Sequence, residues 1–313
     1  MKLAASKSTW TAALFLVLLV VAISIRQPSF WSADNLLNIT RQMSINAIIA
    51  AGMTLVILTG GIDLSVGSIL AFVGIVTALA LKAGLPAGLA GLCGALLGAA
   101  LGSLNGLLIA FGRMPPFVVT LAMMAVARSL TRVVTDNKSI YNLPEGLSLL
   151  SDNLELTPIG LRIPIPFLLT ALVYGFGYLL LMHYPLGRHI YALGGNEEAA
   201  RISGVPIQRV KVMVYALCGA LSGFAGVMAI SRLAAADPTS GVMMELDAIA
   251  AVVIGGGSLS GGRGHILGTI AGVVTMAVLH NVMTLLDVNP DWQGTVVGVV
   301  ILGAVLANRA HPR

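Results

Sequence analysis

Residues 186–212 read LGRHIYALGGNEEAARISGVPIQRVKV, a charged stretch between two long apolar runs in a chain with few charges elsewhere. Asn196 is placed to cap a short helix. Glu197 and Glu198 fall in the first turn of that helix, and Gly204 follows where it should end. Such signals between membrane-length runs predict a short helix at a membrane surface. A helix in that position is typical of a contact with another protein.

The composition of the chain is that of an integral membrane protein. Its 313 residues are 57% hydrophobic and only 10% charged, whereas soluble domains have about 25% charged residues. Apolar runs long enough to cross a bilayer recur along the chain, and no short alternating strands indicate a barrel. We therefore expect an all-α fold, a single polytopic transmembrane bundle over residues 1–313 with about ten membrane segments, near residues 10–26, 43–59, 64–81, 86–112, 117–134, 164–183, 210–230, 245–257, 266–286 and 292–308.

Two of these segments differ from ordinary membrane helices. Segment 10–26 is followed by no small-x-small cleavage site, so we expect an uncleaved first helix rather than a secretory signal. Segment 245–257 is short and interrupted by glycine. It is expected to be a re-entrant piece whose backbone is shielded by other helices.

Lysine and arginine predict the orientation in the membrane. With the N-terminus inside, both termini and a short loop of about 186–209 are cytoplasmic, and the acidic loop of about 136–163 lies outside. The basic residues are scattered singly without interleaved aromatic residues, so the net charge of +5 indicates topology rather than a nucleic-acid partner. The expected cytoplasmic face holds ten of the 18 basic residues: Lys2, Lys7, Arg113, Arg188, Arg201, Arg209, Lys211, Arg263, Arg309 and Arg313.

Glycine recurs at a spacing of four in several segments, which predicts close helix packing in lipid. The positions are Gly94, Gly98, Gly102 and Gly106, and the pairs Gly219/Gly223, Gly268/Gly272 and Gly294/Gly298. Two glycine-rich strings also match each other, TGGIDLSVG at 59–67 and IGGGSLSGG at 254–262. They are compatible with a duplicated transporter half or with a chance match of glycine-rich sequence.

No motif of enzymatic chemistry is found. The chain has no phosphate-binding loop, no HExxH, no Gly-x-Ser-x-Gly and no Cys/His set with metal spacing. The string GGGSLSGGRG at 255–264 lacks the lysine that would bind a nucleotide phosphate. We expect no catalytic residue, metal or cofactor in this chain, and any energy for transport must come from a partner.

A few polar residues fall in or beside the membrane segments. Asp63 and Asp247 could couple an ion, but their positions favour helix capping or another structural role. Neutral polar side chains are candidates for the path of a hydroxylated solute, although hydrogen bonding between helices is the favoured explanation for each one. They are Asn46, Thr54, Asn105, Thr120 and Asn281.

Three strings in order, LTGGIDLSVGS (58–68), GRHIYALGGNEEAARISGV (187–205) and ELDAIAAVVIGGGSLSGGRG (245–264), resemble the ribose/xylose-type permeases of bacterial ABC sugar importers. The resemblance runs from about residue 35 to the C-terminus. It implies a multi-pass subunit of the bacterial inner membrane, surrounded by lipid, that moves a monosaccharide or a related polyol or furanosyl solute. It does not identify the sugar.

The resemblance also implies partners and site residues. Such permeases pair with a second permease, identical or paralogous, receive sugar from a periplasmic binding protein and use a separate ATPase that binds ATP and Mg. The family's contact with the ATPase falls on Gly194, Gly195, Asn196, Glu197, Ala200 and Gly204. Together with the matching strings and polar residues, it predicts a path or gate at Asn46, Gly60, Gly61, Asp63, Ser65, Asn105, Gly255, Gly256 and Gly257.

Two other functions are compatible with a membrane bundle. An ion-coupled carrier acting alone would use Asp63 or Asp247 as an ion site and need no ATPase. A membrane scaffold would carry no solute at all. Neighbouring genes for an ATPase and a sugar-binding protein would separate these classes.

Overall fold

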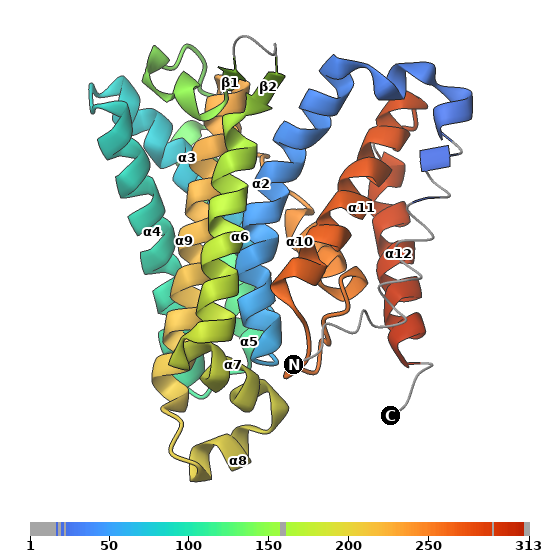
Figure 1. Ribbon diagram of the computed structural model, residues 1–313. Helices are drawn as coiled ribbons and strands as arrows, with labels where there is room; N and C mark the ends of the chain where they lie inside the picture. Colours follow the sequence, from blue (N-terminus) through green and yellow to red (C-terminus); the bar gives the residue numbers. More distant parts are fainter. Residues whose placement is uncertain (1–16, 18–19, 22, 157–160, 290, 310–313) are drawn as a thin grey trace.

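The computed structural model describes residues 17, 20–21, 23–156, 161–289 and 291–309, and it forms a helical bundle (Figure 1). The predicted segment 10–26 lies largely outside these residues. The elements are η1 (Pro28–Trp31), α2 (Ala33–Leu58), α3 (Val66–Lys82), α4 (Ala87–Ala110), α5 (Pro116–Thr135), η2 (Glu145–Leu150), β1 (Asn153–Leu156), β2 (Leu161–Pro164), α6 (Ile165–His183), α7 (Pro185–Gly195), α8 (Glu197–Ile202), α9 (Ile207–Leu233), α10 (Met244–Ile254), α11 (Ile266–Leu285) and α12 (Asp291–Arg309).

Six of the described helices are long and apolar enough to cross a membrane, namely α2, α4, α5, α6, α9 and α11. Two more apolar helices are shorter: α3, and α12 over Asp291–Leu306. The expected helical membrane bundle is therefore confirmed. Most predicted segments match their helices within a few residues. However, α2 begins at Ala33 rather than near residue 43, because Ser32 caps it with an Oγ that accepts from the backbone N of Asn35 (3.3 Å).

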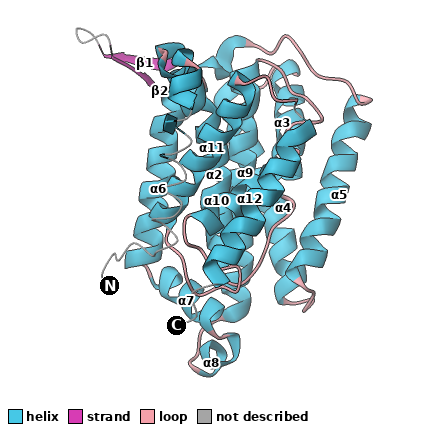
Figure 2. Cartoon of the chain, turned by 90° about the vertical axis from the view of Figure 1, so that its right-hand side faces the viewer, coloured by secondary structure: helices cyan, strands magenta, loops and turns pink. Residues whose placement is uncertain are grey.

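The two ends of the bundle differ. One end carries η2 and a hairpin in which β1 and β2 pair antiparallel, with Asn153 opposite Pro164. This hairpin, within the predicted loop 136–163, is an addition to the expected all-α fold. The opposite end carries α7 and the projecting α8 (Figures 1 and 2). The two loops predicted to lie on opposite faces of the membrane are thus at opposite ends of the molecule.

Helices α2 and α9 lie in the core and are buried over most of their length. Glycine lets α4 approach α9 closely: a Cβ on Gly98 would be 2.3 Å from the carbonyl oxygen of Gly219. A Cβ on Gly272 of α11 would be 1.9 Å from Ala251 O of α10. These positions confirm the predicted packing. The prediction fails for Gly298, since no described atom lies within 4 Å of its Cβ position.

Helix α10 has only 11 residues and ends at Ile254, as expected for the short segment. It contacts α2, α3, α11 and α12, and residues 247–255 are all buried. Glycine-rich connections follow α2 (residues 59–65) and α10 (residues 255–265). We call them the first break and the second break.

Candidate functional site

The first break is held by side chains. Asp63 Oδ1 accepts hydrogen bonds from the backbone N (2.9 Å) and the Oγ (2.6 Å) of Ser65, directly before α3. Asn105 of α4 donates from Nδ2 to Ser65 Oγ (2.9 Å), and Thr120 of α5 donates to Ile62 O (3.3 Å). These bonds fit the predicted structural role of Asp63, because its carboxylate orders the turn that precedes α3.

The second break is held mainly by its backbone. Four of its glycines have positive φ: Gly256 (89°), Gly261 (83°), Gly262 (69°) and Gly264 (146°). Ser258 N donates to Arg263 O (2.9 Å), which closes the loop. At its end, His265 Nδ1 accepts from Leu267 N (3.2 Å) and caps α11, and partial burial holds the pKa of His265 below its usual value.

The two breaks touch each other. Gly262 N donates to Leu58 O, the last residue of α2, at 3.0 Å. A Cβ on Gly261 would be 2.7 Å from Gly60 N and 2.9 Å from Gly194 O. The matching glycine-rich strings thus lie together, and helix α7 reaches the place where they meet.

Helix α7 contacts the end of α2 and the second break through its backbone and a tyrosine. A Cβ on Gly194 would be 1.9 Å from Leu58 O and 2.5 Å from Gly262 N, so only glycine fits there. Tyr191 donates from its hydroxyl to Gly264 O at 2.9 Å. In contrast, nothing lies within 4 Å of a Cβ on Gly195. Of the predicted contact residues, Gly194 therefore faces the bundle.

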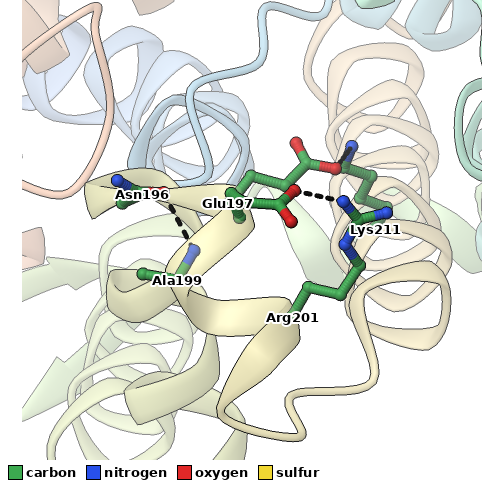
Figure 3. Close-up of polar contacts among 6 residues, drawn as sticks. Asn196, Glu197, Ala199, Arg201 and Lys211 are labelled. Atoms are coloured by element: carbon green, nitrogen blue, oxygen red, sulfur yellow. Dashed lines mark hydrogen bonds and ion pairs between the residues drawn. The ribbon is translucent and has the colours of Figure 1, made fainter.

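Helix α8 is built as predicted (Figure 3). Asn196 Oδ1 accepts from Ala199 N at 2.9 Å, and Gly204 follows the helix with φ of 83°. Glu197 in the first turn pairs with Lys211 of α9 at 2.7 Å, which ties α8 to a long membrane helix. Ala200 is 4% exposed and faces the bundle, whereas Asn196, Glu197 and Gly204 are exposed.

The predicted path residues are brought together in part. Asp63, Ser65 and Asn105 form one cluster in which each is 0% exposed. Gly61 and Gly255 are also buried, and a Cβ on Gly255 would be 2.4 Å from Gly268 O. Gly60 and Gly256 are less enclosed and have positive φ. Asn46 lies apart in α2, and Gly257 packs on Val252.

The other polar residues have structural partners. Thr54 Oγ1 bonds Thr269 Oγ1 across two helices (2.9 Å), and Asn281 exchanges two hydrogen bonds with Asn35. Asp247 does not cap α10. Both of its carboxylate oxygens lie 3.1 Å from His280 Nε2 of α11.

Arg128 and Glu245 were not among the predicted site residues. Arg128, in the middle of α5, donates from Nη1 to Pro238 O (2.9 Å) and Ser240 O (2.7 Å). Glu245 lies in the first turn of α10, and its carboxylate contacts the start of α3 beside Gly67. Their signal in the sequence is the charge itself, because ionisable residues inside membrane segments are rare and usually functional.

The chain matches known transport proteins over almost its whole length. Residues 35–305 match the family described as branched-chain amino acid transport system / permease component. A ribose import permease protein of Bacillus subtilis is 49% identical over 94% of this chain and 90% of the relative. The ribose import permease protein of Haemophilus influenzae is 44% identical over 94% and 90%. The D-allose transport system permease protein of Escherichia coli is 36% identical over 94% and 90%.

No solved structure matches the chain. No group of three or more metal-binding side chains occurs among the described residues. The sequence matches and the apolar helices both indicate a membrane permease. The chain belongs to the permease-component family of ABC importers and is a multi-pass protein of the inner membrane.

Proposed function

We propose that this chain is the membrane-spanning subunit of an ATP-driven importer for a monosaccharide or a related polyol or furanosyl solute. Its relatives are named for ribose, D-allose and L-arabinose transport. Their common feature is a small, neutral, polyhydroxylated molecule. In this chain we expect about ten membrane segments in a single domain, with both termini in the cytoplasm.

We assign the expected partners to the two ends of the molecule. A separate ATPase, which binds ATP and Mg, docks on α8 and the neighbouring α7 through Gly195, Asn196, Glu197 and Gly204. A periplasmic binding protein delivers the solute at the end that carries β1 and β2. A second permease, identical or paralogous, completes the path within the lipid bilayer.

One observation carries the coupling proposal. Gly194 and Tyr191 place α7 in direct contact with the end of α2 and with the second break, while α8 at its end is exposed. A push on α8 by the ATPase therefore reaches the backbone of the second break without passing through a flexible side chain. Close-packed interiors transmit such displacements because they cannot compress. We infer that the second break is the gate and that the first break is the surface on which it closes.

Reconstitution tests this function. The purified chain in proteoliposomes should move no radiolabelled sugar against a gradient. Adding the ATPase and binding protein encoded beside it, with ATP, should start uptake. Concentrative uptake by the chain alone, driven by a proton or sodium gradient, would instead establish the ion-coupled carrier.

A further inference from the structure

Two opposite charges, one on α5 and one at the start of α10, lie close to the same connecting segment at mid-membrane depth. Arg128 lies 12 positions after Pro116, the start of α5, so it is about 18 Å along a membrane-spanning helix at 1.5 Å per residue. Its bonds to Pro238 O and Ser240 O hold the connection between α9 and α10 at the same depth. Glu245 lies in the first turn of α10, shortly after Ser240 in the sequence.

These two side chains interact electrostatically but are not paired. Arg128 and Glu245 are each within the other's electrostatic reach. Neither takes part in any of the ion pairs found in the described part of the chain. The Nη1 of Arg128 makes its two carbonyl bonds, while its other guanidinium nitrogens are not among the buried atoms that lack a partner. The two charged groups are therefore too far apart to form an ion pair, and we call the separation between them the gap.

This gap lies beside the exposed residues at the start of α10. Val242 is 56% exposed and residues 243–246 are partly exposed, whereas Asp247, only a little further along, is 8% exposed. Hydrocarbon cannot cover a guanidinium and a carboxylate at this depth, because charged groups at the bilayer centre must face water or protein. The open turn of α10 therefore borders an aqueous space or a partner.

A sugar hydroxyl fits such a gap. A hydroxyl donates one hydrogen bond and accepts others, so it can donate to a carboxylate while it accepts from a guanidinium. Bonds to charged groups are also the stronger ones. Neutral diols therefore suit this site better than an anion, which Glu245 would repel, or a cation, which Arg128 would repel.

We propose that Arg128 and Glu245 bind vicinal hydroxyl groups of the solute midway across the membrane. This proposal rests on the sugar-import function proposed above and gives it a binding subsite. The solute would reach the site along the connection 234–243, which starts beside the loop before β1 through the pairing of Ile140 with Ala236. The buried cluster at Asp63 would then be a structural wall and not a solute contact.

The first test measures transport by the complete importer, with D-ribose, D-allose and L-arabinose as probes. Glu245→Gln keeps the shape of the side chain but removes its charge. Uptake should fall about tenfold or more, the effect of weakening a hydrogen bond to a charged group. The half-saturating concentration should not change, because the binding protein sets it. Glu155→Gln, an exposed carboxylate on the hairpin that is also paired with an arginine, is the matched control and should transport normally.

The second test remains valid if Glu245→Gln folds poorly. Val242→Cys is made in a Cys93→Ala background, and Cys218 can stay because it is fully buried. A membrane-impermeant thiol reagent should label this cysteine, and saturating sugar should slow labelling several-fold, the degree of occupancy expected for a bound solute. Glycine betaine, which has no hydroxyl group, should not slow the labelling.

The outcomes separate the two proposals. If the wild-type importer takes up none of the sugars, the proposed function falls, and the site falls with it. If wild type transports while Glu245→Gln is normal and sugar does not protect Val242→Cys, only the site is overturned. An unreactive Val242→Cys also overturns it, because the face would then be covered by a second copy of the chain.

Discussion

The first and second breaks are similar in sequence but are held in different ways. In the first break, the side chains of Asp63, Ser65 and Asn105 bond one another in full burial. The second break relies on backbone bonds, on glycines with positive φ and on contacts with α7. We infer from this difference that the first break is a fixed block and that the second changes shape when α7 moves.

The strongest challenge to this comparison is at Gly194. Gly194→Ala should reduce ATP-driven uptake by about a hundredfold or more, since its Cβ would overlap Leu58 O and force α7 away from the end of α2 and the second break. Gly195→Ala is the matched control, because its Cβ meets open space, and uptake should stay within about twofold of wild type. Uptake is measured in cells at equal membrane content of the two variants. Equal transport by both would show that α7 does not drive the breaks.

A second prediction compares two glycines with positive φ. Gly262→Ala should lower uptake about tenfold or more, because the added Cβ would be 2.8 Å from the backbone of Gly195 and would separate α7 from the second break. Gly60→Ala has space around its Cβ and should cost only the strain of its backbone, about 1–2 kcal/mol of stability. Uptake and thermal unfolding of the purified variants measure both effects. The reverse ranking would assign the moving part to the first break.

Substitutions of Asp63 test whether its carboxylate has a structural role or is an ion site. Asp63→Ala leaves Ser65 N and Oγ buried without an acceptor and should cost about 1–3 kcal/mol. Asp63→Asn keeps the accepting Oδ1, so stability should change by about 1 kcal/mol or less, and uptake should persist without sodium or pH dependence. Loss of transport in a stable Asp63→Asn variant would indicate that the carboxylate acts in transport.

The smallest expected effect concerns His265, which caps α11 through a neutral Nδ1. Because its pKa is lower in the folded state than in the unfolded chain, the cap is intact above pH of about 6.5. Its contribution to stability is lost as the pH falls from there towards the folded pKa. His265→Asn keeps a capping acceptor that does not titrate, so its melting temperature should fall less than that of wild type between neutral and mildly acidic pH. Parallel curves would mean that the cap adds nothing.

Local rules predicted much of this molecule. The length of the apolar runs predicted most helices. Capping chemistry predicted α8, because the Asn196 side chain accepts a hydrogen bond from a residue only three positions away. The four-residue glycine spacing predicted a close-packing face on α4, and the structure places this face against α9. Each of these features depends on neighbours in sequence or on one helix face.

The remaining features depend on contacts between distant segments. Nothing near Gly194 in sequence shows that it meets Leu58 and Gly262, and Asp247 pairs with His280 only because α10 and α11 pack together. Helix α2 begins earlier than predicted, at Ala33, since polar residues outside the bilayer can continue a helix as far as its cap. The glycine spacing was misleading at Gly298, where no described partner is close. Spacing identifies a face, but the partner must come from the fold.

The central claim is that α7 moves the second break while the first stays fixed. Hydrogen–deuterium exchange of the assembled importer tests it directly, with peptides covering residues 59–65 and 255–265 compared with and without ATP. The account predicts that nucleotide changes exchange in 255–265 and leaves 59–65 protected. Equal changes in both peptides, or a change confined to 59–65, would contradict it.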